Sequence, residues 1–485
     1  MTDDDLAYLP VDRQLALFAS GELTPRDVLE AQLRRIDRLD ARIRSVTDRY
    51  DARALAQADE AATRWRDGTA RPLEGITVAL KEEQAIAGES LTFGSQARAA
   101  AGATADIDHP VVERVREAGG IAHIRTTTPE YSAAGFSRSR LWGETISPWD
   151  ARLSSGGSSG GSGAALAAGF TTVATGSDVA GSLRIPASAC GVVGFKPPYA
   201  SIAALPTESF DTYCHDGAMG RTVRDTVALH DVLAGQHPRD FISLPHVYHL
   251  GRAMAEIEPS EVRVGVARRM GDAPQLGLMD EGIAEAMSAL SAAGVAVTEV
   301  HLPWNMHELA EAAFTHYGSI MAPMIRAGLG EAFADAESYT RDFVEAADQA
   351  HARNGHFHSI QWEARVQADL AAIFADVDVI VCPTGMVPAL PVGDDVADHR
   401  VAVGDETVEV IHHLEAFFAM PFNMASRLPV FAVPTSACHD GPPASVQVVG
   451  RAYDPAAAAA VAAIIEEAAQ WYADEAGRSR IGLNL

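Results

Sequence analysis

Residues 152–197 constrain this chain more than any other stretch, because they hold two segments rich in Gly and Ser. The first segment, residues 156–163, contains Gly and Ser alone, and the second, residues 176–182, carries Gly and Ser at both ends. Between them, residues 164–169 are compatible with a helix and residues 171–175 with a strand. We therefore expect both segments to lie at the ends of ordered elements and to face each other.

A loop so poor in Cβ atoms can adopt positive φ values and lets another group approach the main chain closely. It can also hold a non-proline cis peptide, which persists mainly at functional sites. A flexible linker is disfavoured by the apolar, periodic sequence that follows. A phosphate-binding loop would be followed by Gly-Lys-[Ser/Thr], which is missing here. A nucleophile elbow would fit the pattern Gly156-x-Ser158-x-Gly160, but it requires a buried strand directly before it, and the sequence predicts none there.

Lysine is rare in this chain. Of its 38 basic residues, only Lys81 and Lys196 are lysine, and the rest are arginine. Arginine stays protonated, whereas a desolvated lysine can lose its proton and act as a base. Lys81 directly follows residues 76–80, whose apolar side chains alternate as in a half-buried strand. We expect Lys81 at a strand end, where catalytic groups are common, while for Lys196 a structural role is at least as plausible as a chemical one.

Together these residues resemble the amidase signature family, whose members use a triad of serine, cis-serine and lysine. The resemblance runs from SGELTPRDVLEAQLRRID near the start to PPASVQVVGRAYDP near the end. Its most specific part is GGSSGG, whose first serine, Ser158, stands 24 positions before Ser182 of GSDVAGSLRIPA. The resemblance implies a single large α/β domain with a mixed, mostly parallel central β-sheet surrounded by helices.

The resemblance also assigns roles to individual residues. It implies that Ser182 is the nucleophile, that Ser158, after a cis peptide, bridges the triad, and that Lys81 is the terminal base. It implies further residues around them: an oxyanion hole formed by the backbone amides of Val179, Ala180, Gly181 and Ser182; supporting residues Asp178, Arg184, Gly157 and Ser159; and substrate contacts at Ser132 and Tyr131. Asp178 and Arg184 could instead form an ordinary surface ion pair, and the segment around Ser132 could be an ordinary loop.

The chemistry of such a site is consistent with general principles. A serine hydroxyl is a weak nucleophile that needs a positioned base, and a neutral lysine can serve through a second hydroxyl. Two positions depart from the family pattern. Ala180 stands where the family usually has Gly, which would introduce strain if this position needs positive φ. Glu82 stands after the lysine where Asp is common. Neither change removes a catalytic side chain.

Composition limits the class of partner and the cell compartment. The net charge of −27 and pI near 4.9 argue against binding to nucleic acid or anionic membranes. The acidic N-terminus does not resemble a secretory signal, and no run of 18 apolar residues is present. The four cysteines form no CxxC pair and are expected to be buried, reduced thiols: Cys190, Cys214, Cys382 and Cys438. We therefore expect a cytoplasmic monomer or homodimer.

No metal or cofactor is expected. His356-x-His358 with Glu363 nearby lacks a further ligand at a suitable spacing. The expected partner is a small-molecule amide or carbamate substrate.

Along the chain, residues 1–65 are expected to form an N-terminal helical collar, and residues 66–485 the catalytic domain. Thr24 and Asp27 form a capping pattern at the start of one collar helix. Within the catalytic domain, residues 236–410 are expected to form a variable substrate funnel. Residues 305–375 are expected to be helical there, and residues 384–410 a long loop. A final helix is expected over residues 455–473, capped by Asp454.

Three functions remain open from the sequence. The first is a hydrolase that cleaves an acyl C–N bond in a carboxamide, anilide or carbamate, with esterase or urethanase side activity. The second is the glutaminase subunit of a tRNA-dependent amidotransferase, which shares these motifs. The third is a non-catalytic binding member of the family, which retention of Lys81, Ser158 and Ser182 together disfavours.

Overall fold

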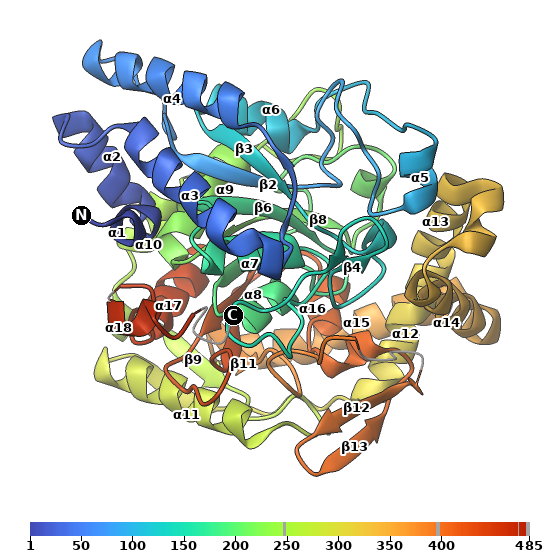
Figure 1. Ribbon diagram of the computed structural model, residues 1–485. Coiled ribbons are helices and arrows are strands. Elements are labelled where there is room, and N and C mark those ends of the chain that lie inside the picture. Colours follow the sequence, from blue (N-terminus) through green and yellow to red (C-terminus); the bar gives the residue numbers. More distant parts are fainter. Residues whose placement is uncertain (246–248, 394–397, 474, 482–485) are drawn as a thin grey trace.

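The structure is a computed structural model of the chain, and it describes all residues except 246–248, 394–397, 474 and 482–485. Within the described residues, one sheet of eleven strands runs through the molecule with helices on both sides (Figure 1). In spatial order its strands are β1 (Val46–Arg49), β3 (Ile121–Thr126), β2 (Thr77–Lys81), β6 (Val173–Asp178), β8 (His215–Gly220), β7 (Val193–Lys196), β14 (Val430–Pro434), β15 (Ser445–Val449), β11 (Val379–Pro383), β9 (Arg263–Val266) and β10 (Ala296–Glu299).

The sheet is mixed, as expected, but its centre is not parallel. Parallel pairing is confined to two blocks, β3–β2–β6 and β11–β9–β10. The strands between them, from β6 through β8, β7, β14 and β15 to β11, pair antiparallel, as does β1 at the edge. A parallel pair needs a long crossover, which helices supply in both blocks, whereas a short turn joins β14 to β15. The expectation of a mostly parallel sheet is therefore corrected for the centre.

Two helices cover the face of the sheet that carries the candidate site. α7 (Gly160–Ala167) contacts β2, β3 and β6, and α8 (Arg184–Cys190) contacts β7, β14 and β15. The opposite face packs against α6 (Pro110–Glu117), α9 (Val223–Leu233), α10 (Leu250–Ala255), α11 (Gly277–Ala292) and α17 (Ala456–Glu467). Each face thus packs into apolar clusters of its own, two on each face.

Strand β2 illustrates how this layering places Lys81. All five of its residues are buried, so the strand is covered on both faces and not half-buried as its alternation indicated. Val78 and Leu80 belong to the cluster with α6 and α9, whereas Ala79 belongs to the cluster with α7. Because side chains alternate along a strand, Lys81 points to the same face as Ala79, toward α7.

The N-terminal region is helical, with α1 (Asp3–Ala7), α2 (Val11–Ser20), α3 (Pro25–Ile43) and α4 (Asp51–Arg66) at the blue end of Figure 1. Thr24 and Asp27 form the expected capping box at the start of α3. Strand β1 lies between α3 and α4 and pairs with β3, so this region also contributes the edge of the main sheet.

Residues 305–375 are helical, as expected. They form α12 (Met306–Ser319), α13 (Met321–Leu329), α14 (Ser338–Asn354) and α15 (His356–Phe374). In Figure 1, α13 and α14 lie on the right-hand side of the molecule, and α5 (Gln96–Ala100) lies on the same side. Other short elements are the helices α16 (Met420–Met424) and α18 (Glu475–Arg478) and the strands β4 (Arg138–Ser139) and β5 (Gly143–Glu144).

Two other expectations are corrected. Residues 384–410 are not one loop, because β12 (Arg400–Val403) and β13 (Glu406–Glu409) form an antiparallel hairpin there; residues 394–397 lie outside the described residues. The last long helix, α17, ends at Glu467 and begins after Pro455, with no side-chain cap from Asp454. Within the described residues, no helix is both long enough and apolar enough to cross a membrane.

Candidate active site

Lys81 occupies the last position of β2, and its side chain is fully buried. Its Nζ donates hydrogen bonds to the Oγ of Ser158 at 2.7 Å and to the Oγ of Ser177 at 2.9 Å. A third contact, at 2.9 Å, joins Nζ to the Oε1 of Glu83. The structure thus brings Lys81 and Ser158 together, and it adds two partners, Ser177 and Glu83, that sequence reasoning missed.

Ser158 follows a cis peptide bond from Gly157, as the family resemblance implied. Position 157 has no room for a side chain, because a Cβ there would lie 2.4 Å from the carbonyl oxygen of Phe136. One residue on, the amide of Ser159 donates to the carbonyl oxygen of Ser182 at 3.3 Å. The Gly/Ser segment and the segment of Ser182 therefore lie against each other, as expected from the sequence.

The turn that carries Ser182 is held from within by Asp178 and Arg184. Both side chains are fully buried, and Arg184 binds both carboxylate oxygens of Asp178, at 2.8 and 3.0 Å. Arg184 also donates to the side chains of Asn423 and Gln447, at 2.7 and 2.8 Å. Burial acts to raise the pKa of Asp178, but the charge and hydrogen bonds of Arg184 and the amide of Asn423 hold it well below its usual range. The pair is therefore an internal support of the turn and not a surface ion pair.

The sequence predicts backbone strain at Ala180 if that position has a positive φ. The positive φ, 107°, belongs to Gly181 and not to Ala180, so alanine at position 180 introduces no left-handed strain. The amide of Gly181 donates to the Oδ1 of Asp178 at 2.9 Å. That amide is therefore engaged inside the turn, whereas the resemblance places it in the oxyanion hole.

Glu83 connects the lysine to the segment expected to contact substrate. Its second carboxylate oxygen accepts a hydrogen bond from the Oγ of Ser132. Ser132 and its neighbour Tyr131 both have positive φ, 55° and 50°, and the Tyr131 ring stacks on Phe93 with centroids 5.5 Å apart. Burial acts to raise the pKa of Glu83, but the charge of Lys81 and the hydrogen bonds of Ser132, Ser177 and Lys81 hold it below its ordinary value.

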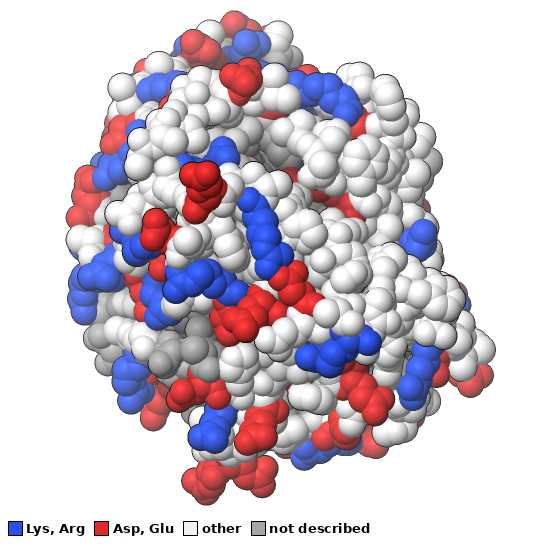
Figure 2. All heavy atoms as spheres, turned by 90° about the vertical axis from the view of Figure 1, so that its right-hand side faces the viewer, with Lys and Arg blue, Asp and Glu red and all other residues white. Residues whose placement is uncertain are grey.

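A cavity of about 240 Å³ adjoins this cluster. Glu83 and Ser177 line it, as does Val179 of the turn before Ser182. The expected substrate contacts, Tyr131 and Ser132, also line it, and other lining residues are Phe93, Arg98, His109, Glu208, Asp211, Asp216, Met321 and Met324. Figure 2 views the side of the molecule that carries α5 and α13, where the surface is hollowed and acidic atoms are visible in the hollow.

The cavity wall is acidic in part. Burial, together with the charges of Glu83 and Asp216, raises the pKa of Glu208 to about 8. Asp216 is bound by the side-chain amide of Gln84 at 2.8 Å, and His109 lies 3.6 Å from its other oxygen. The lining of this cavity therefore combines carboxyl groups with the apolar side chains of Met321 and Met324 of α13.

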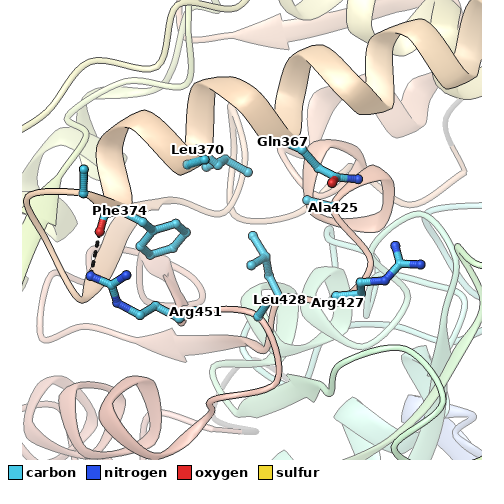
Figure 3. A pocket seen from close by; sticks show the side chains of 10 residues that line it. Gln367, Leu370, Phe374, Ala425, Arg427, Leu428 and Arg451 are labelled. Atoms are coloured by element: carbon cyan, nitrogen blue, oxygen red, sulfur yellow. Dashed lines mark hydrogen bonds between the residues drawn. The ribbon is translucent and has the colours of Figure 1, made fainter.

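A second cavity, of about 380 Å³, lies away from this cluster, between α15 and the segments around residues 425–428 and 451–452. Figure 3 shows Leu370 and Phe374 of α15 projecting toward Leu428 across it, while Arg451 donates to the Phe374 carbonyl oxygen. Its wall is mainly apolar, and it contains neither Lys81 nor the two serines.

The other candidates from the sequence have structural partners. Lys196 is fully buried and donates to backbone carbonyl oxygens, including that of Leu428 at 2.8 Å, which is a structural role. All four cysteines are free thiols; Cys190 and Cys382 are buried, whereas Cys214 and Cys438 are only half-buried. Glu363 accepts a hydrogen bond from the Tyr213 hydroxyl at 2.9 Å. Within the part of the chain that the structure describes, no group of His, Cys, Asp and Glu side chains is arranged to hold a metal ion.

Comparison with known proteins decides the family. Residues 27–457 match the family model described as Amidase. The chain belongs to the amidase signature family. As a member of this family it is a hydrolase that acts on amide bonds.

Relatives of this amidase signature protein match over nearly their whole length. It is 33% identical to the putative amidase AmiB2 of Mycobacterium tuberculosis strain H37Rv, over 97% of this chain and 98% of that one. It is 30% identical to the 6-aminohexanoate-cyclic-dimer hydrolase of Paenarthrobacter ureafaciens, over 95% and 94%. It is 28% identical to a glutamyl-tRNA(Gln) amidotransferase subunit of Chloroflexus aggregans, over 96% and 98%.

Solved structures confirm the fold. A bacterial aryl acylamidase of the amidase signature family superimposes with a TM-score of 0.85 over 98% of both chains, at 22% identity. This likeness establishes the single α/β architecture.

Proposed function

We propose that this amidase signature protein hydrolyses an acyl C–N bond in a carboxamide, anilide or carbamate through an acyl-enzyme on Ser182. The observation that carries the proposal is the buried hydrogen bond of 2.7 Å between Lys81 Nζ and Ser158 Oγ. It supports a relay because a buried amine beside a hydroxyl can take a proton that the hydroxyl has received from a second serine.

In the first half-reaction, the Ser182 hydroxyl gives its proton to Ser158, and Ser158 gives its own proton to a neutral Lys81. The Ser182 oxygen attacks the acyl carbon, and the tetrahedral intermediate forms. The proton then returns along the same relay to the departing amine, the C–N bond breaks, and the acyl group stays on Ser182. In the second half-reaction, the same relay takes a proton from water, and the water oxygen attacks the acyl carbon. The bond between the acyl carbon and the Ser182 oxygen then breaks, the relay returns the proton to that oxygen, and the carboxylic acid leaves.

We propose that backbone amides of the Ser182 turn stabilise the oxyanion of the tetrahedral intermediate. A single donor of this kind contributes roughly 3–4 kcal/mol to catalysis. Because the Gly181 amide is engaged by Asp178, we assign this role to the amides of Val179, Ala180 and Ser182. The buried Asp178–Arg184 pair maintains the turn that presents them.

We propose that the substrate enters the cavity of about 240 Å³ and contacts Tyr131 and Ser132 on its wall. The acyl-enzyme chemistry would also allow esters as side substrates, because the relay can protonate an alcohol leaving group as well as an amine.

The direct test is turnover of a panel of amides, anilides and carbamates by the purified chain and by Ser182→Ala. The variant is expected to lose activity and to keep its fold. Ser188→Ala is the matched control, because Ser188 is a buried serine of α8 whose hydroxyl binds the Pro388 carbonyl oxygen and not Lys81. Substantial hydrolysis by Ser182→Ala would contradict the assignment of the nucleophile.

A second candidate is the glutaminase subunit of a tRNA-dependent amidotransferase, and the resemblance to the amidotransferase subunit of Chloroflexus aggregans supports it. The two functions differ in their need for a partner. Release of amine from simple amides by the chain alone, without tRNA or ATP, would exclude this second candidate. Activity with glutamine only in the presence of partner subunits would favour it.

A further inference from the structure

The environment of Lys81 contains a carboxylate that the Ser–Ser–Lys relay does not require. Glu83 Oε1 lies 2.9 Å from Lys81 Nζ, and the Lys81 side chain is fully buried. The opposite oxygen of Glu83 is held by the hydroxyl of Ser132, so the carboxylate is fixed at both ends. Lys81 Nζ thus has three partners, Ser158, Ser177 and Glu83, and only Glu83 carries a negative charge.

We propose that Glu83 is a positioning residue of the relay, which orients Lys81 Nζ toward Ser158 and stabilises the ammonium that forms when Lys81 accepts the proton. This inference rests on the proposed function, since it deepens the role of the same site. The carboxylate contacts the base and not the reacting serine, and so acts through Lys81. The arrangement follows the logic of a serine–histidine–aspartate triad, in which a buried carboxylate orients the base and stabilises its cation.

Two consequences follow from a carboxylate at this distance. The first is that Glu83 favours the charged form of Lys81 before the reaction, so the relay becomes active at a higher pH than it would without Glu83. The second is that Glu83 lowers the free energy of the transition state, in which Lys81 has gained a proton. Removing the carboxylate should therefore lower the maximal rate and extend the activity to lower pH.

Other titratable groups face Glu83 and Lys81 from neighbouring elements, and their charges add to the electrostatic effect of Glu83 on Lys81. Asp216 of β8, with His109 beside it, and Glu208 of η2 (Glu208–Phe210) all line the cavity with Glu83. Asp216 and Glu208 interact electrostatically with both Glu83 and Lys81. Lys81 forms its ion pair with Glu83, and neither Asp216 nor Glu208 contacts Lys81 as closely.

The kinetic test is the pH profile of kcat/KM for wild type, Glu83→Gln and Glu83→Asp. Glu83→Gln is expected to reduce the plateau about tenfold or more and to move the acid limb by about one pH unit or more toward lower pH. Glu83→Asp keeps a carboxylate and is expected to place the limb between the other two. An acid limb of Glu83→Gln that coincides with that of wild type would overturn the proposal.

The matched control is Glu82→Gln. Glu82 is the neighbouring carboxylate and is also buried, but it accepts its hydrogen bonds from Thr92 and not from Lys81. Its removal is expected to leave the acid limb in place. A limb that moves as far in Glu82→Gln as in Glu83→Gln would show a general effect of buried charge and would also overturn the proposal.

A spectroscopic test is independent of turnover. Because the chain contains only two lysines, labelling lysine with ¹⁵N at Nζ gives two signals, and Lys81→Ala identifies which one belongs to Lys81. The Lys81 signal is expected to titrate at lower pH in Glu83→Gln than in wild type, while the Lys196 signal stays unchanged. If Glu83→Gln does not fold, Glu83→Asp serves in its place, and a Lys81 titration identical to wild type contradicts the proposal.

The two tests separate this inference from the proposed function. A wild-type protein that hydrolyses no amide, although the Lys81 titration depends on Glu83, would contradict the function and leave the ion pair established. An active enzyme whose Lys81 titration ignores Glu83 would contradict the inference and leave the function established.

Discussion

Lys81 Nζ lies 2.7 Å from Ser158 Oγ, and both side chains are fully buried. A buried amine at this distance from a hydroxyl can exchange a proton with it without the intervention of solvent. The lysine reaches this position because β2 ends there and because alternation along the strand turns it toward α7. Substitutions at position 81 can therefore test whether the site needs the amine of lysine and not only its positive charge.

Lys81→Arg is expected to be as inactive as Lys81→Ala, with kcat reduced at least about 10³-fold in both. Arginine keeps the positive charge but does not give up its proton at any pH that proteins tolerate. The measurement is kcat on an anilide substrate, with circular dichroism to check that both variants are folded. An arginine variant with near wild-type activity would contradict the role of Lys81 as a base.

Arg184→Met is expected to lower the free energy of unfolding by about 3–5 kcal/mol, because it leaves Asp178 buried without its counter-charge. The matched control is Arg252→Ala, which breaks an ion pair with Glu256 on the exposed surface of α10, where the side chains are 81% and 66% exposed. That control is expected to cost less than about 0.5 kcal/mol. Urea denaturation measures both values, and equal losses would contradict the internal role of the Asp178–Arg184 pair.

Gly181→Ala is expected to reduce both stability and activity. A Cβ at position 181 would lie 2.4 Å from the Cβ of Ala419, and the φ of 107° is unfavourable for any residue with a side chain. We expect a loss of about 2 kcal/mol or more in the free energy of unfolding. Ala180→Gly is the control, and its cost should stay near about 1 kcal/mol or below. A stable, fully active Gly181→Ala would show that the turn tolerates rearrangement.

The stability of the protein should depend on pH through Glu466. Burial raises the pKa of this carboxyl to about 7, although hydrogen bonds from Tyr472 and the Val223 amide oppose the rise. Its ordinary value is 4.5, so between about pH 4.5 and 7 the folded state binds more protons than the unfolded state. The stability that this carboxyl group contributes is therefore fully present below about pH 4.5, and it is lost as the pH rises to about 7.

Glu466→Gln removes this titration, and so the fall in unfolding free energy between about pH 5 and pH 8 should be smaller in the variant than in wild type. Denaturation at the two pH values measures the difference. A fall that is as large in Glu466→Gln as in wild type would show that Glu466 does not carry this dependence.

Much of the fold could be predicted from local patterns. The alternation before Lys81 predicted β2, and the capping residues Thr24 and Asp27 predicted the start of α3. The antiparallel centre of the sheet could not be predicted in this way, because it depends on which distant strands pair. Likewise, the hairpin of β12 and β13 could not be predicted, because each strand has only four residues and such short strands do not stand out from a loop.

The residues of the candidate site could be predicted where an unusual local composition marked them. Ser158 and Ser182 stood out in segments rich in Gly and Ser, and Lys81 stood out because lysine is rare. Glu83 was missed, since its contact with Lys81 depends on how the chain turns after β2, although the Lys-Glu-Glu run was visible. Asp178 was predicted to support the turn, but its hydrogen bond with the Gly181 amide required the three-dimensional structure.

The central claim is that Ser182 carries the acyl group while Lys81 and Ser158 move protons. The most direct measurement is mass spectrometry of peptides from enzyme that is quenched during turnover of an activated amide or ester. We expect the mass of the acyl group on the peptide that contains Ser182. An acyl group on the peptide of Ser158 instead, or hydrolysis with no acylated serine at any time, would contradict the account.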